Sequence, residues 1–276
     1  MSTVRVQDLD MTTLKFSNKT PLSKNGGYMC FLNNTAMGMG KWYLQTPVMR
    51  APFGISRVNP YATNSNPEVA PKVNLMLSFG NSRDPNVKAC HDKMKELDRF
   101  MVASAVSNSV DWFGKKCSEE VVSEKYNACV RPPSKPADEG KEPFPDSMSL
   151  KVYCQGQGEN IDPIDELKLY EWDVDRDSCK EVNSSAIWDV IQRGSELQVI
   201  FRVNMVYFIG KQSWGLTLKA ETIRYIPKFQ EPVGSAQFLS AGPLSAPEDV
   251  EYEEVEVEEG DVEYVEGHEA NNMVEY

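Results

Sequence analysis

Three acidic side chains in one short run have a spacing that could hold a calcium ion. Asp173, Asp175 and Asp177 form an Asp-x-Asp-x-Asp pattern, which is how an EF-hand calcium loop begins. Such a loop needs Gly and Glu at the positions of Ser178 and Ser184. Because both of those residues are missing, we interpret the run as a solvated turn.

A two-metal nuclease site and a phosphate-binding loop are the other candidates for chemistry. Asp162, Asp165 and Glu166 could supply carboxylates to two metals, but their spacing does not define such a site. The segment 38–41 reads Gly-Met-Gly-Lys, yet Thr35 and Trp42 replace the Gly and Ser/Thr of a Walker loop. With only two histidines in the chain, the sequence predicts no enzyme, no metal site and no cofactor.

Cations beside aromatic residues recur in the β-rich segments. Aromatic faces stack on unpaired bases for about 1–3 kcal/mol per base, while cations contact the phosphates. For any single residue the alternative stays open that the ring fills the core and the cation is solvated. The candidate nucleic-acid-binding residues are Lys41, Trp42, Tyr43, Arg50, Phe53, Arg57, Lys72, Arg202, Phe208, Lys211, Trp214 and Lys219.

The charge of the chain is concentrated at its C-terminal end. The 276 residues include 29 Lys and Arg and 41 Asp and Glu, for a net charge of −12. Residues 247–276 hold 13 of the acidic residues and no Lys or Arg, which leaves 28 acidic and 29 basic residues in 1–246. The body is therefore near neutral at +1, and a tail of −13 follows it.

Such a tail is too charged and too poor in large apolar residues to fold alone, so we expect it to be disordered. As a coil it spans roughly 30 Å, against a radius of gyration of about 18 Å for the body. It could therefore compete with nucleic acid for a cationic groove, or only keep the protein soluble. The candidate partner-binding residues of the tail are Glu253, Glu254, Glu258, Glu259, Glu275 and the terminal Tyr276.

Membrane and secreted classes fit the sequence poorly. The longest apolar runs, such as 205–209, have five residues, whereas a membrane span needs about 20. No signal peptide is recognisable at the N-terminus. Six scattered cysteines with no Cys-x-x-Cys pair indicate reduced thiols in an intracellular protein.

Hydrophobic periodicity predicts a helix within 81–108 and several strands. Cys90, Met94, Leu97, Met101 and Ala105 share one helical face, with Asp84 as N-cap and Pro85 in the first turn. A second helix is predicted at 118–128, strands at 73–79, 150–154 and 167–174, and a Pro-rich loop at 131–147.

Residues 194–226 have the strongest pattern in the chain. Odd-numbered positions from Leu197 to Ile209 are all apolar, and after a turn at 210–213 the alternation resumes at Trp214. This predicts a long hairpin whose first strand buries its odd positions. The apolar phase slips near Glu221, where a β-bulge is expected.

The order of several segments resembles a known family. The hairpin GSELQVIFRVNMVYFIGKQSWGLTLKAETIRYIP (194–227) follows YLQTPVMRAPFGIS (43–56), KVNLMLSF (72–79) and DRFM (98–101). In this order, with the acidic tail, the chain is similar to the single-stranded-DNA-binding proteins of large nucleocytoplasmic DNA viruses. These are akin to a podovirus phage protein whose acidic tail ends in an aromatic residue.

The resemblance implies a mainly β fold with accessory helices (α+β), namely an OB-fold-like five-stranded barrel with a helical insertion and a disordered acidic tail. The expected domains are 1–230 for binding, a linker at 231–246 and the tail at 247–276. The implied function is non-sequence-specific single-stranded DNA binding in viral replication, recombination and repair, with no catalysis.

The partners that this interpretation allows are single-stranded DNA, polymerase and helicase-primase bound through the tail, and a second copy of the chain. The expected location is the host nucleus or a cytoplasmic viral replication site. The alternative is a virion or histone-binding protein whose tail binds basic protein.

Overall fold

The computed structural model describes residues 3–22, 27–38, 40–57, 72–80, 84–133, 143–157, 160–209 and 213–227. The chain divides into two units, Met1–Phe229 and Gln230–Tyr276. The second unit, which includes the expected linker and tail, lies outside the described residues. In the described part, no helix is long and apolar enough to cross a membrane.

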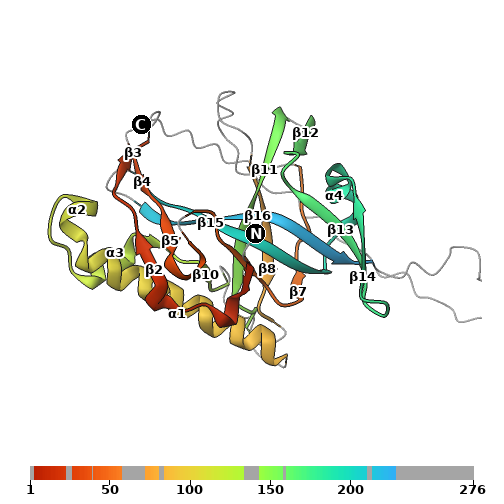
Figure 1. Cartoon of the computed structure of the whole chain (residues 1–276), viewed down its shortest axis with the longest axis horizontal. Helices are drawn as coiled ribbons and strands as arrows, with labels where there is room; N and C mark the ends of the chain where they lie inside the picture. The colour runs from red at the N-terminus through yellow and green to blue at the C-terminus, as the bar shows by residue number, and fades with distance from the viewer. Residues whose placement is uncertain are drawn as a thin grey trace, which may run out of the picture. The chain divides into compact units, whose positions relative to one another are not determined.

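Two long antiparallel strands, β15 (Ser195–Ile209) and β16 (Ser213–Ile226), cross the middle of the first unit (Figure 1). They confirm the hairpin expected from the alternating sequence. Ile200 pairs with Thr222 and Phe201 with Ala220, so Glu221 is an extra residue on β16. This is the bulge that the slipped alternation predicts.

A second irregularity of the hairpin was not foreseen. Val203 pairs with Leu218 and Met205 with Thr217, which inserts one extra residue into β15. Beyond this point the buried side switches, so that Val206 and Phe208 are buried while Ile209 is 53% exposed. The prediction that odd positions stay in the core up to Ile209 is therefore wrong for 205–209.

Five strands pair in a closed circuit. β15 pairs with β7 (Met49–Ala51), β7 with β8 (Lys72–Ser78), β8 with β11 (Ser147–Gln157), β11 with β16, and β16 again with β15. Val73, Leu75 and Leu77 of β8 face the interior, with Leu150 and Val152 of β11 on the same side. We call the opposite, polar side of these strands the outer face.

Shorter strands extend this circuit. The parallel or antiparallel neighbours are β1 (Thr3–Arg5), β3 (Thr20–Pro21), β4 (Tyr28–Cys30), β6 (Tyr43–Gln45), β9 (Tyr126–Asn127), β10 (Val130–Arg131), β12 (Asn160–Pro163), β13 (Lys168–Asp173) and β14 (Ser178–Val182). A separate pair joins β2 (Leu14–Phe16) to β5 (Leu32–Asn34). The expectation of a mainly β fold with accessory helices is confirmed.

The long helix α1 (Pro85–Ser107) runs along one side of the strands (Figure 1). Asp84 caps it by accepting a hydrogen bond from the Asn86 backbone, and the predicted face from Cys90 to Ala105 is buried, as expected. The other helices are α2 (Ser109–Phe113), α3 (Glu119–Glu124) and α4 (Ile187–Val190). α3 is shorter than the predicted 118–128, because β9 begins at Tyr126.

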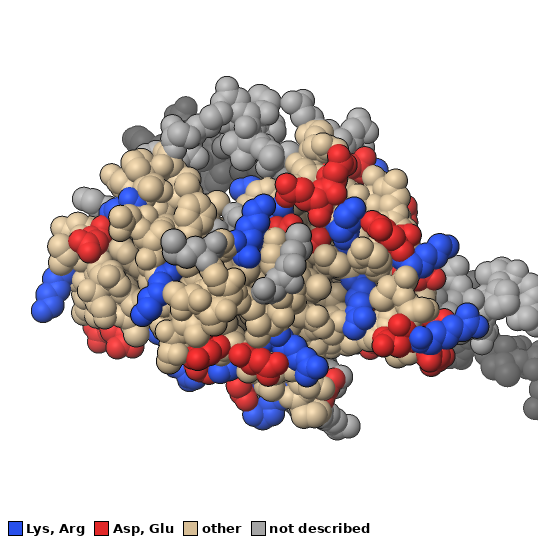
Figure 2. Space-filling model, in the orientation of Figure 1, with Lys and Arg blue, Asp and Glu red and all other residues tan. Residues whose placement is uncertain are grey.

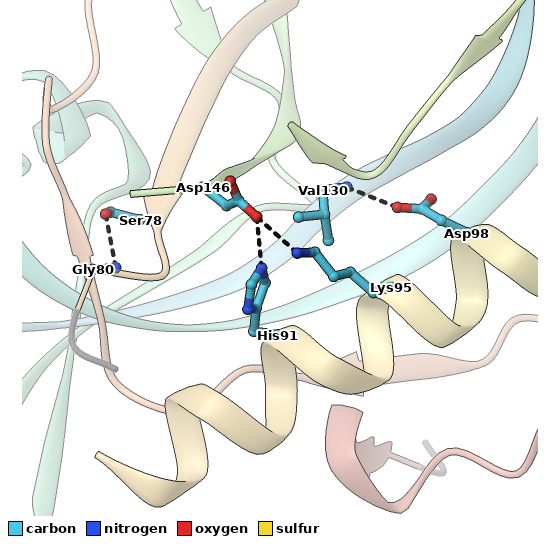
Figure 3. Close-up of polar contacts among 7 residues, drawn as sticks. All are labelled: Ser78, Gly80, His91, Lys95, Asp98, Val130 and Asp146. Atoms are coloured by element: carbon cyan, nitrogen blue, oxygen red, sulfur yellow. Dashed lines mark hydrogen bonds and ion pairs between the residues drawn. The ribbon is translucent and has the colours of Figure 1, made fainter. Parts of the chain in front are cut away.

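Carboxylates hold α1 against the strands (Figure 3). Asp146, just before β11, accepts contacts from His91 Nε2 at 2.9 Å and Lys95 Nζ at 3.1 Å. Burial alone would raise the pKa of Asp146, but its contacts with Lys95 and His91 outweigh burial and lower the pKa. Further along α1, Asp98 accepts hydrogen bonds from the backbone nitrogens of Cys129 (2.8 Å) and Val130 (3.0 Å).

We expect Asp98→Asn to destabilise the fold by about 1–3 kcal/mol, because the amide cannot accept from both backbone N–H groups and one would be left unsatisfied. Asp92→Asn is the matched control on the same helix, since Asp92 is 60% exposed and pairs with the exposed Lys88. Its expected effect is within about 0.5 kcal/mol. Urea midpoints measure both; equal midpoints would contradict the role of Asp98.

Candidate nucleic-acid interface

Alternation places a row of cations on the outer face of the closed circuit. Lys72 of β8 lies opposite Tyr153 of β11. On the next strands, Lys151 pairs with Lys219, and Lys219 pairs with Arg202. Side chains directly opposite each other lie about 4.5–5.5 Å apart at Cβ. We call Lys72, Lys151, Lys219 and Arg202 the cation row.

An aromatic ring lies within this row. Lys72 Nζ is 4.9 Å from the centroid of the Tyr153 ring, and Lys219 Nζ is 5.4 Å from it. Burial lowers the pKa of Lys151, and the neighbouring charges of Arg131 and Lys72 lower it further. Burial is the larger cause of this shift, and the positive charges gathered around Lys151 add to it.

Two carboxylates balance the row. Lys219 is only 5% exposed, and its Nζ contacts Glu166 at 2.7 Å and Glu221 at 3.3 Å. Glu221 also pairs with Arg202 at 3.3 Å. The hydrogen bond and charge of Lys219 lower the pKa of Glu166, with smaller effects from Lys41 and Arg202. Lys41 thus contributes to the same electrostatic environment as the row.

The outer face continues onto β13 and contains a cavity. Arg224 Cζ lies 3.6 Å from the Trp172 ring centroid. Next to this pair is a cavity of about 280 Å³, lined by Gln45, Tyr170, Cys179, Gln198, Ile200, Thr222 and Arg224. Aromatic and cationic side chains therefore lie side by side across the four neighbouring strands β8, β11, β16 and β13.

A second group forms after β7. Phe53 is 69% exposed, and Arg57 Cζ lies 5.5 Å from the Trp188 ring centroid. Gly54 has φ +65°, and a Cβ there would come within 2.7 Å of Ile191 O, so only glycine fits this turn. Arg50 is exposed and packs against Gly194. This group is separate from the cation row.

Four predicted aromatic residues lie in the core. Tyr43 and Phe208 are 5% and 3% exposed. Trp42 Nε1 donates to Leu32 O at 2.7 Å and Trp214 Nε1 donates to Val122 O at 3.0 Å, with both rings 1% exposed. Because these rings have no free face for a base, we leave all four out of the proposed site. Lys211 and the tail residues Glu253, Glu254, Glu258, Glu259, Glu275 and Tyr276 lie outside the described residues.

The sequence reasoning missed Lys151, Tyr153, Tyr170, Trp172 and Arg224. The segments 150–154 and 167–174 were expected to be strands, and β11 and β13 confirm this. The available signal was their alternation, which puts Lys151 and Tyr153 opposite the apolar residues. What the signal could not supply is the pairing of β11 and β13 with β16.

Several of the acidic residues considered for metals contact other side chains. Asp162 Oδ1 accepts from Trp188 Nε1 and Asp177 Oδ1 from Trp172 Nε1, each at 3.2 Å. Among the described residues, no three His, Cys, Asp or Glu side chains form a group that could hold a metal.

Figure 2 shows acidic and basic side chains interspersed on the face in view, without a large patch of one sign.

No protein-family model matches the chain, and no curated protein matches its sequence. Among solved structures, the single-stranded DNA-binding protein gp2.5 of bacteriophage T7 is similar at 15% identity and a TM-score of 0.39, over 69% of this chain and 96% of that one. The single-stranded DNA-binding protein of bacteriophage Enc34 in complex with single-stranded DNA is similar at 12% identity and 0.39, over 79% and 98%.

The burial of the predicted aromatic residues can be checked by substitution. We expect Trp214→Ala to destabilise the protein by about 3–5 kcal/mol, because it empties a buried site and removes the hydrogen bond to Val122 O. Phe53→Ala, which truncates an exposed ring, should leave the unfolding midpoint nearly unchanged. Thermal or urea unfolding of both variants measures this; a stable Trp214→Ala protein would show that the ring is not part of the core.

Proposed function

We propose that this protein binds single-stranded DNA without sequence preference, along the outer face of the closed strand circuit. The observation that carries the proposal is the cation row, which spans four adjacent strands and flanks the ring of Tyr153. Cations contact the phosphates, and aromatic faces stack only on bases that are unpaired. This combination favours a single strand over a duplex.

Glu166 has a defined part in this proposal. It covers the buried ammonium group of Lys219, but its own side chain is 63% exposed. A phosphate that approaches Lys219 therefore displaces Glu166 into solvent, where it is easily hydrated. Glu221 is only 14% exposed and stays beside Lys219 and Arg202, so it limits the net charge that the row presents.

The wider role proposed is in viral DNA replication, recombination and repair. The acidic segment 247–276, with 13 carboxylates and no Lys or Arg, would compete with DNA for the cation row and recruit polymerase or helicase-primase once displaced. The closed circuit of five strands supports an OB-fold-like barrel. The OB-fold is a five-stranded barrel that binds oligonucleotides in many proteins. The family of large-DNA-virus proteins stays a prediction.

The same acidic segment also favours a second candidate, a virion or histone-binding protein. In that case basic protein would bind to the tail, and the outer face would have no nucleic-acid ligand. The two candidates differ in whether the body without the tail binds oligo(dT).

Substitutions of opposite charge on the outer face should change DNA affinity in opposite directions. Lys72→Gln removes an exposed cation and should weaken oligo(dT) binding, lowering the slope of log affinity against log salt by about 0.7. Glu166→Gln removes the counter-ion of Lys219 and should tighten binding severalfold. Fluorescence titration at several salt concentrations measures both effects.

Lys88→Gln and Asp92→Asn are the matched controls. Lys88 and Asp92 form an ion pair of the same 2.7 Å length on the solvent side of α1, with similar exposure to that of Glu166. Neither control should alter binding by more than the long-range effect of one charge. If the controls and the outer-face variants change affinity equally, binding does not occur at the cation row.

Removal of residues 247–276 tests the role of the acidic segment. A protein of residues 1–246 should bind oligo(dT) more tightly than the full chain, and its affinity should depend more steeply on salt, because no internal polyanion competes. Equal affinities of the two proteins would refute the competition. Binding of a basic protein by the full chain, with no oligo(dT) binding by either protein, would favour the histone-binding alternative.

A further inference from the structure

The cavity on the outer face has walls whose chemistry suits a planar heterocycle. Tyr170 provides an aromatic wall and Ile200 an apolar one. At about 280 Å³ the cavity lies just below the roughly 300 Å³ at which pockets for whole small molecules begin. It can therefore take one ring system and not an extended ligand.

Polar groups complete the same cavity. Gln45 of β6, Gln198 of β15 and Thr222 of β16 line it, and Ile200 pairs directly with both Gln45 and Thr222. Glutamine amides and threonine hydroxyls both donate and accept hydrogen bonds. They can therefore match any unpaired base, because the Watson–Crick edge of every base presents both kinds of group.

Arg224 adds a donor that needs an acceptor. Its guanidinium group stacks on Trp172 and its Nη1 lies 4.0 Å from Cys179 Sγ. Its Nε is buried and makes no hydrogen bond with any residue in the described part of the chain. An unsatisfied buried donor is destabilising, so an acceptor that reaches this nitrogen on ligand binding would contribute to affinity.

The cavity lies one nucleotide away from the cation row. Ile200, in its wall, and Arg202, in the row, are two residues apart on the same side of β15. At a rise of about 3.3 Å per residue, this separation is about 7 Å. A base in the cavity can thus belong to the same strand whose phosphates contact Arg202 and Lys219.

We propose that this cavity is a nucleobase subsite, in which one base of the bound strand leaves the stack and lies against Tyr170. Its edge meets Gln45, Gln198 and Thr222, while the phosphates beside it contact the cation row. This inference rests on the proposed function, because it assumes that a single strand follows the outer face. It adds a site where the base itself, and not only the backbone, is bound.

Cys179 is a reporter for this subsite. It is exposed and lines the cavity, whereas Cys30, Cys90, Cys129 and Cys154 are buried. In a Cys117→Ser background, Cys179 is the accessible thiol. The rate at which a maleimide modifies it can be measured alone, with oligo(dT), and with an abasic oligonucleotide of equal length that keeps the phosphates but has no bases.

We expect oligo(dT) at saturation to slow the modification of Cys179 at least severalfold, and the abasic strand, also at saturation, to leave the rate close to that of the free protein. Equal protection by both strands would mean that the backbone covers the cavity, and would overturn the subsite. So would unchanged reactivity with oligo(dT) demonstrably bound.

A second variant separates this inference from the proposed function. Thr222→Val keeps the side-chain shape and removes the hydroxyl group, so it should weaken oligo(dT) binding and leave abasic-strand binding unchanged. Thr217→Val on the same strand is the matched control and should change neither. If neither oligo(dT) nor the abasic oligonucleotide binds the unmodified protein, the proposed function fails. If both bind and Thr222→Val has no effect, only the subsite fails.

Discussion

The structure depends on the register between β15 and β16. Each of these strands pairs with several others, so a shift of one residue would move every side chain on them to the opposite side. The extra residue at Glu221 keeps Ala220 and Ile223 in the core and leaves Lys219, Thr222 and Arg224 on the outer face. This bulge therefore joins the cation row and the cavity into one surface.

Burial then determines which cations of that surface need a carboxylate partner. An ammonium group such as that of Lys219, 5% exposed, is stable only when it is paired. Glu166 and Glu221 provide this pairing within 3.3 Å. The charges of Lys219 and Arg202 are thus already paired with carboxylates. In the proposed function, a phosphate that reaches Lys219 would exchange one anion for another without creating a bare charge.

Local patterns in the sequence predicted what depends on local interactions. Helix α1, its cap at Asp84, the β15–β16 hairpin and the bulge at Glu221 all follow from periodicity and capping chemistry. The burial of Phe208 could not be predicted. The second irregularity, after Val203, switches which side of β15 is buried, and the residues there are almost all apolar, so the sequence pattern does not show the switch. The grouping of Tyr153 and Trp172 with Lys219 was also hidden, since it comes from pairings between segments far apart in the chain.

The near-neutral charge of the body limits the ways in which this protein could bind a polyanion. With +1 on residues 1–246 and −12 on the whole chain, the protein offers no long-range attraction to DNA. At about 0.1 M salt, interactions between exposed charges are screened beyond roughly 10 Å, so contacts at short distance dominate over the net charge. In the proposed function, binding energy would then come from short-range exchange of carboxylate for phosphate and from base contacts. For this reason the aromatic groups and the cavity beside the row matter as much as its charges.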